Sequence, residues 1–158
     1  MTTPNTPERD EQDPIIGPVL PTGPIIEIRI SIAEPVRQAL SIKGEPEPAS
    51  LEGPALIDTG SGYCVVDTTQ LAKLDIRQIG MQTVGFPGTK STLYRPVYAV
   101  DLVVPQLATS IEIEHAVGMD LAGFYGYDRP LLALLGRDFL AMFKFSYDGP
   151  TGVFALGT

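Results

Sequence analysis

The residues best suited to chemistry in this 158-residue chain follow the apolar run 55–57 and are Asp58, Thr59, Gly60 and Ser61. An apolar run that ends in an acid, a small hydroxyl residue and a glycine is typical of a strand that delivers a carboxylate to a tight loop. A plain turn has the same composition, so the triplet Asp58-Thr59-Gly60 is a weak signal by itself. The chemistry that such a carboxylate offers is proton transfer.

A second segment further along the chain strengthens this signal. Leu134 and Leu135 lead into Gly136, Arg137 and Asp138, and a short helical pattern follows. Together the two segments resemble the retropepsin-like aspartic proteases, whose active-site loop reads hydrophobic-Asp-Thr-Gly-Ser/Ala and whose later strand ends hydrophobic-Gly-Arg-Asp/Asn. The resemblance extends over roughly residues 25–156, with specific motifs only in these two segments.

The resemblance implies an all-β fold, a retropepsin-like closed β-barrel with one or two short helices and a flap hairpin, which acts as a homodimer. Peptide hydrolysis by carboxylates needs two of them in one site, because one takes a proton from the attacking water while the other, protonated, polarises the scissile carbonyl. The Asp58 triplet has no second copy in the chain. A two-fold symmetric homodimer in which Asp58 meets its counterpart would supply the second carboxylate.

The same resemblance assigns tasks to the neighbours of the catalytic Asp58. Thr59 would cross-link the two loops near the dimer axis, and Gly60 would allow the substrate backbone to approach closely. Ser61 would hydrogen-bond the carboxylate, which favours its ionised form. We therefore expect activity at more acid pH than in an alanine variant.

Two strands, at 81–84 and 93–104, flank a tip rich in glycine and proline, which predicts a hairpin. Most such hairpins only connect strands. This one lies between the two motifs, where the resembled family has its flap, and there it would close over the substrate and exclude water. The flap residues are Gly85, Phe86, Pro87 and Gly88.

The resemblance also places walls and supports around the catalytic loop. Leu132 and Leu134 fall where the family has apolar walls of the substrate pocket. Gly136 and Arg137 would pack beneath the Asp58 loop as structural support, followed by Asp138.

One position departs from the viral pattern. In the viral enzymes an acid two residues after the triplet pairs with the arginine, whereas this chain has Gly62 there. We expect Arg137 to pair with Asp67 or Asp138 instead. The closing segment 135–156 looks more like the end of a pepsin lobe than the short viral terminus, which leaves the mode of dimerisation open.

The composition limits the partners. A net charge of -8 and a pI near 4.5 argue against nucleic acid and anionic membranes, which the chain would repel. The lone Cys64 forms no intrachain disulfide, and no signal peptide or long apolar run is evident, so we expect a cytoplasmic protein. The single His115 rules out a multi-histidine metal site, and we expect no metal or cofactor. The expected partners are a polypeptide substrate and a second copy of the chain.

The domain boundary is predicted at residue 24. Residues 1–24 contain six of the fifteen prolines and an acidic cluster, so we predict a flexible Pro-rich acidic arm ahead of a protease domain at 25–158. The arm could also occupy a groove or be trimmed. Alternating isoleucines predict a strand from Ile26, and 36–43 is predicted as its partner strand.

Further elements are predicted along the domain. Asp67 is predicted to cap a short helix that ends near residue 74. We expect a loop over 119–128 whose aromatic residues line a pocket or cover the core, and a closing hairpin around 148–151.

Two other functions remain open. The first is a non-catalytic retropepsin-fold module for dimerisation or peptide binding, since a fold does not determine a function. The second is a serine or cysteine hydrolase that uses Ser61 or Cys64 with His115. Neither nucleophile lies in a nucleophile-elbow pattern, and the histidine lies on an alternating strand, so this function is not favoured. A buried thiol is the simpler interpretation of Cys64.

Overall fold

The computed structural model describes residues 12–85, 88 and 90–158, and strands dominate this part of the chain. The helices are α1 (Glu34–Lys43), α2 (Thr68–Lys73) and α3 (Arg137–Leu140), with a 3₁₀ turn, η1, at Pro105–Leu107. The strands are β1 (Ile15–Leu20), β2 (Gly23–Ile32), β3 (Leu51–Ile57), β4 (Val65–Asp67), β5 (Gly80–Gly85), β6 (Thr92–Val104), β7 (Thr109–Met119), β8 (Tyr125–Gly126), β9 (Arg129–Pro130), β10 (Ala133–Leu135), β11 (Lys144–Asp148) and β12 (Val153–Gly157).

Six of these strands close a barrel. Around the ring, β2, β3, β10, β4, β7 and β6 are neighbours in that order, and β6 pairs again with β2. The pairs β3–β10 and β4–β7 are parallel and the other pairs in the ring are antiparallel. The predicted all-β class with a closed barrel and a few short helices is confirmed.

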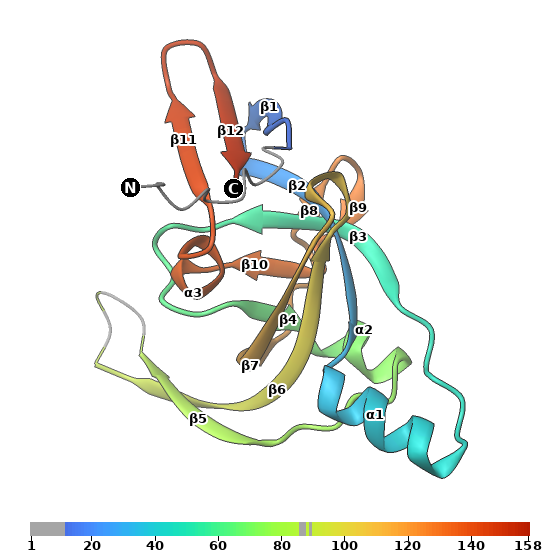
Figure 1. The fold of residues 1–158 in the computed structure, drawn as a ribbon. Coiled ribbons are helices and arrows are strands. Elements are labelled where there is room, and N and C mark those ends of the chain that lie inside the picture. The colour runs from blue at the N-terminus through green and yellow to red at the C-terminus, as the bar shows by residue number, and fades with distance from the viewer. Residues whose placement is uncertain (1–11, 86–87, 89) are drawn as a thin grey trace, which may run out of the picture.

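Two hairpins extend the ring, as the sequence predicts. β5 pairs antiparallel with β6 to form one hairpin, and β11 pairs antiparallel with β12 to form the closing hairpin. Figure 1 shows β11, β12 and β1 together at one end of the barrel and α1 at the other.

Alternation along the strands builds the core. Ile26, Ile28 and Ile30 of β2 are buried in the barrel interior with residues from every other strand of the ring. A smaller apolar cluster lies apart from this core and contains Ile25 and Val65 among its members. Period-two strands present one face to each cluster, so the barrel has an apolar patch outside as well as a core inside.

The predicted arm is wrong for its second half. Residues 15–20 form β1, which pairs with β12 through Ile15 and with β2 through Val19. Both side chains also pack against the barrel core. Strand pairing on two sides and apolar packing together offset the conformational entropy that this segment loses when it becomes ordered. Residues 1–11 of the predicted arm lie outside the described residues.

The predicted strand over 36–43 is also wrong, because this segment belongs to helix α1. Pro35 lies in the first helical turn, where its missing N–H costs nothing. Gly44 ends the helix with φ at 69°, in the left-handed region. Local start and stop signals therefore outweighed the strand pattern.

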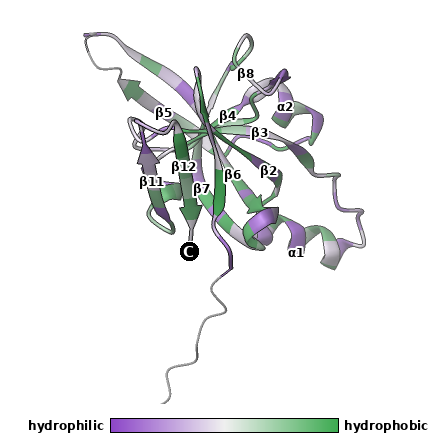
Figure 2. Ribbon diagram, turned by 90° about the horizontal axis from the view of Figure 1, so that it is seen from above, coloured by the Kyte–Doolittle hydropathy of each residue, from purple (hydrophilic) through white to green (hydrophobic). Residues whose placement is uncertain are grey.

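Helix α1 is attached to the barrel mainly through polar contacts, since none of its residues is buried. Figure 2 shows hydrophilic and hydrophobic residues alternating along it. Arg37 donates to Glu34, to Glu47 at 2.8 Å and to Ser31 Oγ at 3.2 Å, and it lies 3.7 Å from Asp101 of β6. One guanidinium thus joins the helix to β2, to β6 and to the loop after the helix.

Other predicted elements are present with small differences. The side chain of Asp67 caps α2 by accepting from the backbone of Gln70 at 2.9 Å. The predicted loop 119–128 contains β8, which pairs with β9 across Tyr127 and Asp128, both with positive φ. Among the described residues, no helix has the length and apolar character needed to cross a membrane.

We predict that Arg37→Met lowers the free energy of unfolding by about 1 kcal/mol. Hydrogen bonds from Gln38 and Arg37 lower the pKa of Glu34 from its ordinary 4.5. The part of the stabilisation that comes from Glu34 is therefore present above its ordinary pKa and is lost as the pH falls through its lowered pKa. Urea unfolding at pH 6 and pH 3.5 should show a smaller pH difference in the variant than in wild type.

Arg29→Met is the matched control for this experiment. Arg29 is more exposed, and its nearest carboxylate oxygen, on Glu52, is 3.9 Å away. An equal loss in both variants would contradict a special role for Arg37.

Candidate active site

Asp58 leaves the barrel at the end of β3 with its carboxylate held by its own loop. Its backbone N–H donates to the carbonyl of Leu135 at 3.0 Å. The N–H of Gly60 donates to Asp58 Oδ1 at 3.0 Å, and the N–H of Ser61 donates to the carbonyl of Asp58 at 3.2 Å. This tight turn fixes the direction of a half-buried carboxylate.

The parallel pairing of β3 with β10 brings the two sequence motifs together. Ile57 lies opposite Leu135 in the register, so Asp58 and Gly136 leave the sheet at the same edge. We name residues 58–64 the Asp58 loop and residues 135–138 the bracing segment. Every residue of the bracing segment contacts the Asp58 loop.

Gly136 makes the closest of these contacts. A Cβ atom built on Gly136 would lie 2.3 Å from the carbonyl oxygen of Tyr63, far inside contact distance. The N–H of Arg137 donates to the carbonyl of Ser61 at 3.0 Å. Backbone therefore packs directly on backbone here, which only glycine permits.

Arg137 braces the loop through a carbonyl and not through an acid. Its Nη1 donates to the carbonyl oxygen of Thr59 at 2.9 Å, and its Nη2 lies 3.5 Å from where a Cβ on Gly62 would be. The expectation that Asp67 or Asp138 pairs with Arg137 is wrong. Where Gly62 supplies no acid, a backbone oxygen of the loop takes the guanidinium.

Asp138 holds the far end of the loop. Its Oδ2 accepts from the backbone N–H of Cys64 at 2.9 Å, and its Oδ1 accepts from the Cys64 thiol at 3.1 Å. The N–H of Phe139 also donates to Oδ1 at 2.8 Å. The bracing segment thus holds both ends of the Asp58 loop.

Ser61 does not serve Asp58 as expected. Its hydroxyl donates to the carbonyl oxygen of Tyr63 at 2.6 Å and lies 3.4 Å from the N–H of the same residue. The hydroxyl is turned along the loop by this local contact, because the chain curls back between residues 61 and 63. The hydrogen bond from Ser61 to the carboxylate is therefore a wrong prediction.

Cys64 lacks the character of a nucleophile. Its side chain is fully buried in the main core. Burial, and then the neighbouring Asp138 carboxylate, raises the pKa of the thiol, so it stays protonated at neutral pH. His115 is exposed on β7. The structure thus argues against a cysteine hydrolase at this loop.

A cavity of about 330 Å³ lies beside Asp58. Its walls come from the Asp58 loop, from β4, β5, β7 and β10, and from the loop that follows β7. Several of its apolar side chains belong to the smaller cluster outside the barrel core. The lining residues are Asp58, Gly60, Ser61, Gly62, Tyr63, Val65, Val84, Gly85, Val117, Met119, Asp120, Leu121, Phe124 and Leu134.

The two predicted pocket leucines separate. Leu134 is half-buried and lines the cavity. Leu132 is 5% exposed and packs over Gly53 in the main core, so its predicted place in the pocket is wrong. Two residues spaced by two lie on the same face only within a regular strand. Because β10 begins at Ala133, Leu132 lies outside the strand and points to a different side from Leu134.

The predicted flap hairpin reaches the cavity from β5. Val84 and Gly85 line the cavity near Asp58, and Gly88 is exposed with φ at 82°. The predicted flap residues Phe86 and Pro87 lie outside the described residues.

Thr59 is exposed in the Asp58 loop, where its carbonyl is the acceptor for Arg137.

The sequence left open whether the loop after β7 lines a pocket or covers the core, and the structure places part of it in the wall of the cavity, including Asp120, which sequence reasoning did not single out. Asp67 was expected as a helix cap or as the partner of Arg137, yet its Oδ2 accepts from the N–H of Leu121 at 2.8 Å. Of the aromatics in the predicted loop 119–128, Phe124 lines the cavity, whereas Tyr125 and Tyr127 are exposed elsewhere. Asp67 is only 5% exposed, and an acid that is so buried needs more donors than a helix cap supplies, but this burial is visible only in the structure.

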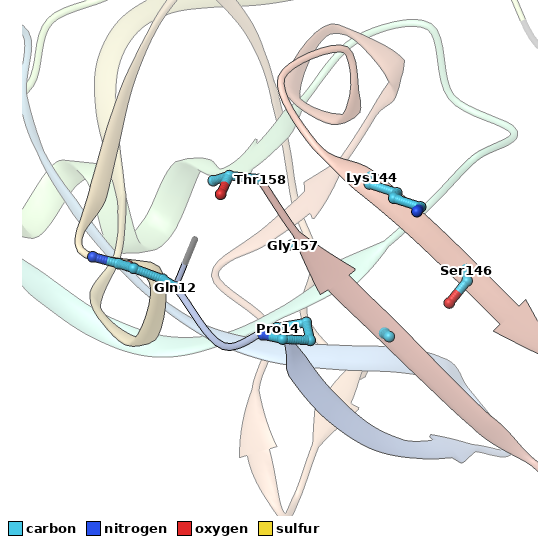
Figure 3. A pocket seen from close by; sticks show the side chains of 7 residues that line it. Gln12, Pro14, Lys144, Ser146, Gly157 and Thr158 are labelled. Atoms are coloured by element: carbon cyan, nitrogen blue, oxygen red, sulfur yellow. The ribbon is translucent and has the colours of Figure 1, made fainter. Parts of the chain in front are cut away.

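Another cavity, of about 350 Å³, lies against the sheet formed by β11, β12 and β1. Figure 3 shows Lys144 and Ser146 on β11 and Gln12 and Pro14 ahead of β1. No acidic side chain is among its described lining residues.

Among all the described residues, no group of three or more histidine, cysteine or acidic side chains could hold a metal ion.

Comparisons with known proteins give a limited result. No family model matches the chain, and no curated protein matches its sequence. The chain is similar in structure to a retropepsin-like aspartic protease from Rickettsia conorii, with 14% sequence identity and a TM-score of 0.44 over 96% of this chain and 97% of that chain. At that TM-score the likeness adds no support for a shared activity.

We predict that Gly136→Ala destabilises the fold strongly. The added methyl group would meet the Tyr63 backbone at 2.3 Å, and neither segment can move without breaking the hydrogen bonds between them. The free energy of unfolding should fall by about 3 kcal/mol, measured by urea denaturation. Gly80→Ala is the matched control, because nothing lies within 4 Å of its Cβ position, and it should change stability by about 0.5 kcal/mol. Equal losses in the two variants would contradict the close-packing argument.

Proposed function

We propose that this protein is an aspartic endopeptidase that hydrolyses peptide bonds in extended polypeptides. The observation that supports this most directly is the placement of Asp58, a braced carboxylate at the edge of an apolar cavity large enough for a side chain. Such a cavity with few polar groups suits a peptide side chain next to the group that does the chemistry. The Asp-Thr-Gly motif at the same position supplies the chemical class.

In the proposed mechanism, Asp58 from each subunit of a homodimer activates one water. Two carboxylates close together do not both ionise, so one accepts the proton of the attacking water and the other donates to the scissile carbonyl. The Gly60 N–H occupies one acceptor position of the Asp58 carboxylate. An ionised carboxylate has about four such positions, so the rest of its surface is available for water and for the partner acid.

The β5–β6 hairpin takes the role of a flap in this proposal. Val84 and Gly85 contribute to the same cavity as Asp58, so a peptide in the cavity would lie against the hairpin. Closure of the hairpin over the peptide would exclude water that competes with the catalytic one. Thr59, exposed beside Asp58, would face its counterpart near the two-fold axis.

The decisive test is cleavage of a mixed peptide library between pH 3 and pH 8 by wild type and Asp58→Asn. Asparagine keeps an acceptor for the Gly60 N–H and so preserves the loop, but it cannot exchange a proton. We expect wild type to cut and the variant to lose activity by about 100-fold or more. Sedimentation in the same buffers should show a dimer, because a strict monomer would leave Asp58 without its partner.

A dimeric wild type that cuts nothing would contradict the enzyme. The same library then distinguishes the alternative, a non-catalytic dimerisation or peptide-binding module. In that case peptides would be retained by the protein without being cleaved.

We predict that Ser61→Ala leaves the pH profile of cleavage unchanged. The hydroxyl contacts Tyr63 and not the Asp58 carboxylate, so its removal does not alter the charge balance of the acid pair. Loss of this hydrogen bond should lower the free energy of unfolding by about 1 kcal/mol. Rates across the pH range measure the first effect and urea denaturation the second. If the acid limb of the pH profile shifts in Ser61→Ala, the Ser61 hydroxyl does contact the Asp58 carboxylate, as the motif suggested.

A further inference from the structure

An acid interrupts the apolar wall of the Asp58 cavity. Valine, leucine, methionine and phenylalanine side chains make up half of the described lining residues, and Asp120 is the one acid among these lining residues besides Asp58. No lysine, arginine or histidine is among the described lining residues. A ligand side chain in this cavity would therefore meet an apolar surface and, at Asp120, an unneutralised negative charge.

Asp120 is held in position by the residues on either side of it. The carbonyl of Met119 accepts from the hydroxyl of Thr68 at 3.4 Å, and the N–H of Leu121 donates to Asp67 at 2.8 Å. Asp67 is 5% exposed and also caps α2. The backbone at Asp120 is thus fixed to the start of a helix, so its side chain emerges from a rigid support.

The carboxylate of Asp120 keeps acceptor capacity for a ligand. Its Oδ1 accepts from the N–H of Ala122 at 2.8 Å, which fixes the rotation of the side chain. An ionised carboxylate has about four acceptor positions. The side chain is exposed, so the remaining positions face solvent or whatever enters the cavity.

We propose that Asp120 selects substrates with a lysine or arginine side chain next to the scissile bond. Lysine and arginine have a long apolar stem that ends in a cation. The stem would pack against the apolar side chains of the wall, and the cation would meet the carboxylate of Asp120. A carboxylate accepts a charge-assisted hydrogen bond from either cation. This inference rests on the proposed peptidase function and adds the class of residue that it recognises.

The test uses pairs of peptides that differ at one position, lysine in one and norleucine in the other, so that the apolar stem is kept and the cation is removed. The position is varied on both sides of the cleaved bond. For wild type we expect the lysine peptide to have about 10-fold higher kcat/KM at the position that enters the cavity, mostly through KM. The ratio should fall as salt rises to about 0.5 M.

Two variants with the same change of charge isolate Asp120. Asp120→Asn keeps an acceptor for the Ala122 N–H and removes the charge, and the lysine to norleucine ratio should drop to about one. Glu114→Gln removes a charge from an exposed residue of β7 that does not line the cavity, and its ratio should match wild type. Equal cleavage of both peptides by wild type, or a preference that survives in Asp120→Asn, would overturn the proposal.

A binding measurement separates failure of this inference from failure of the enzyme. Fluorescence anisotropy with Asp58→Asn, and with Asp58→Asn combined with Asp120→Asn, compares the affinities of the two peptides without cleavage. A lysine preference that depends on Asp120 supports the recognition even where wild type cuts nothing. If neither the lysine peptide nor the norleucine peptide binds, the proposed recognition by Asp120 is overturned.

Discussion

The contact on which the site depends is the packing of the bracing segment against the Asp58 loop. Gly136 touches the Tyr63 backbone at a distance that no side chain allows, Arg137 holds the Thr59 carbonyl, and Asp138 holds the N–H of Cys64. These contacts exist because β3 and β10 run parallel and end at the same edge of the barrel. The carboxylate of Asp58 is therefore oriented by backbone hydrogen bonds before any substrate arrives, which lowers the cost of reorganisation during a reaction.

The cavity has a different origin from the barrel core. Strands of period two present one face inward and one outward. Residues of β2, β4 and β7 make a smaller apolar cluster with Leu121 and Leu131, and Leu134 of β10 packs against it. The hairpin end of β5 and the loop after β7 cover part of that cluster and leave the cavity between them. Asp67, buried at the start of α2, ties the loop after β7 to this structure. The part of the cavity wall that would contact a substrate is therefore attached to the rigid start of α2.

The charge distribution suits the proposed chemistry. The chain is acidic overall, and the described lining of the Asp58 cavity contains two carboxylates and no basic residue. Arg137 directs its guanidinium to a carbonyl of the loop, so it braces the loop without forming an ion pair with the carboxylate of Asp58. A cationic substrate side chain would find its partner at Asp120, while Asp58 remains available for a second carboxylate across a two-fold axis.

The sequence by itself determined the strand-rich class, the Asp58 loop, the cap of α2 and the two hairpins, because period-two patterns, turn residues and caps act over a few neighbouring residues. Tertiary structure decided the rest. β1 became a strand only through pairing with β12 and β2, and the partner of Arg137 became a carbonyl because Gly62 offers no acid. Leu132 turned into the core because the regular strand begins one residue later. Asp120 reached the cavity through a hydrogen bond between residues far apart in the chain, which no local pattern encodes.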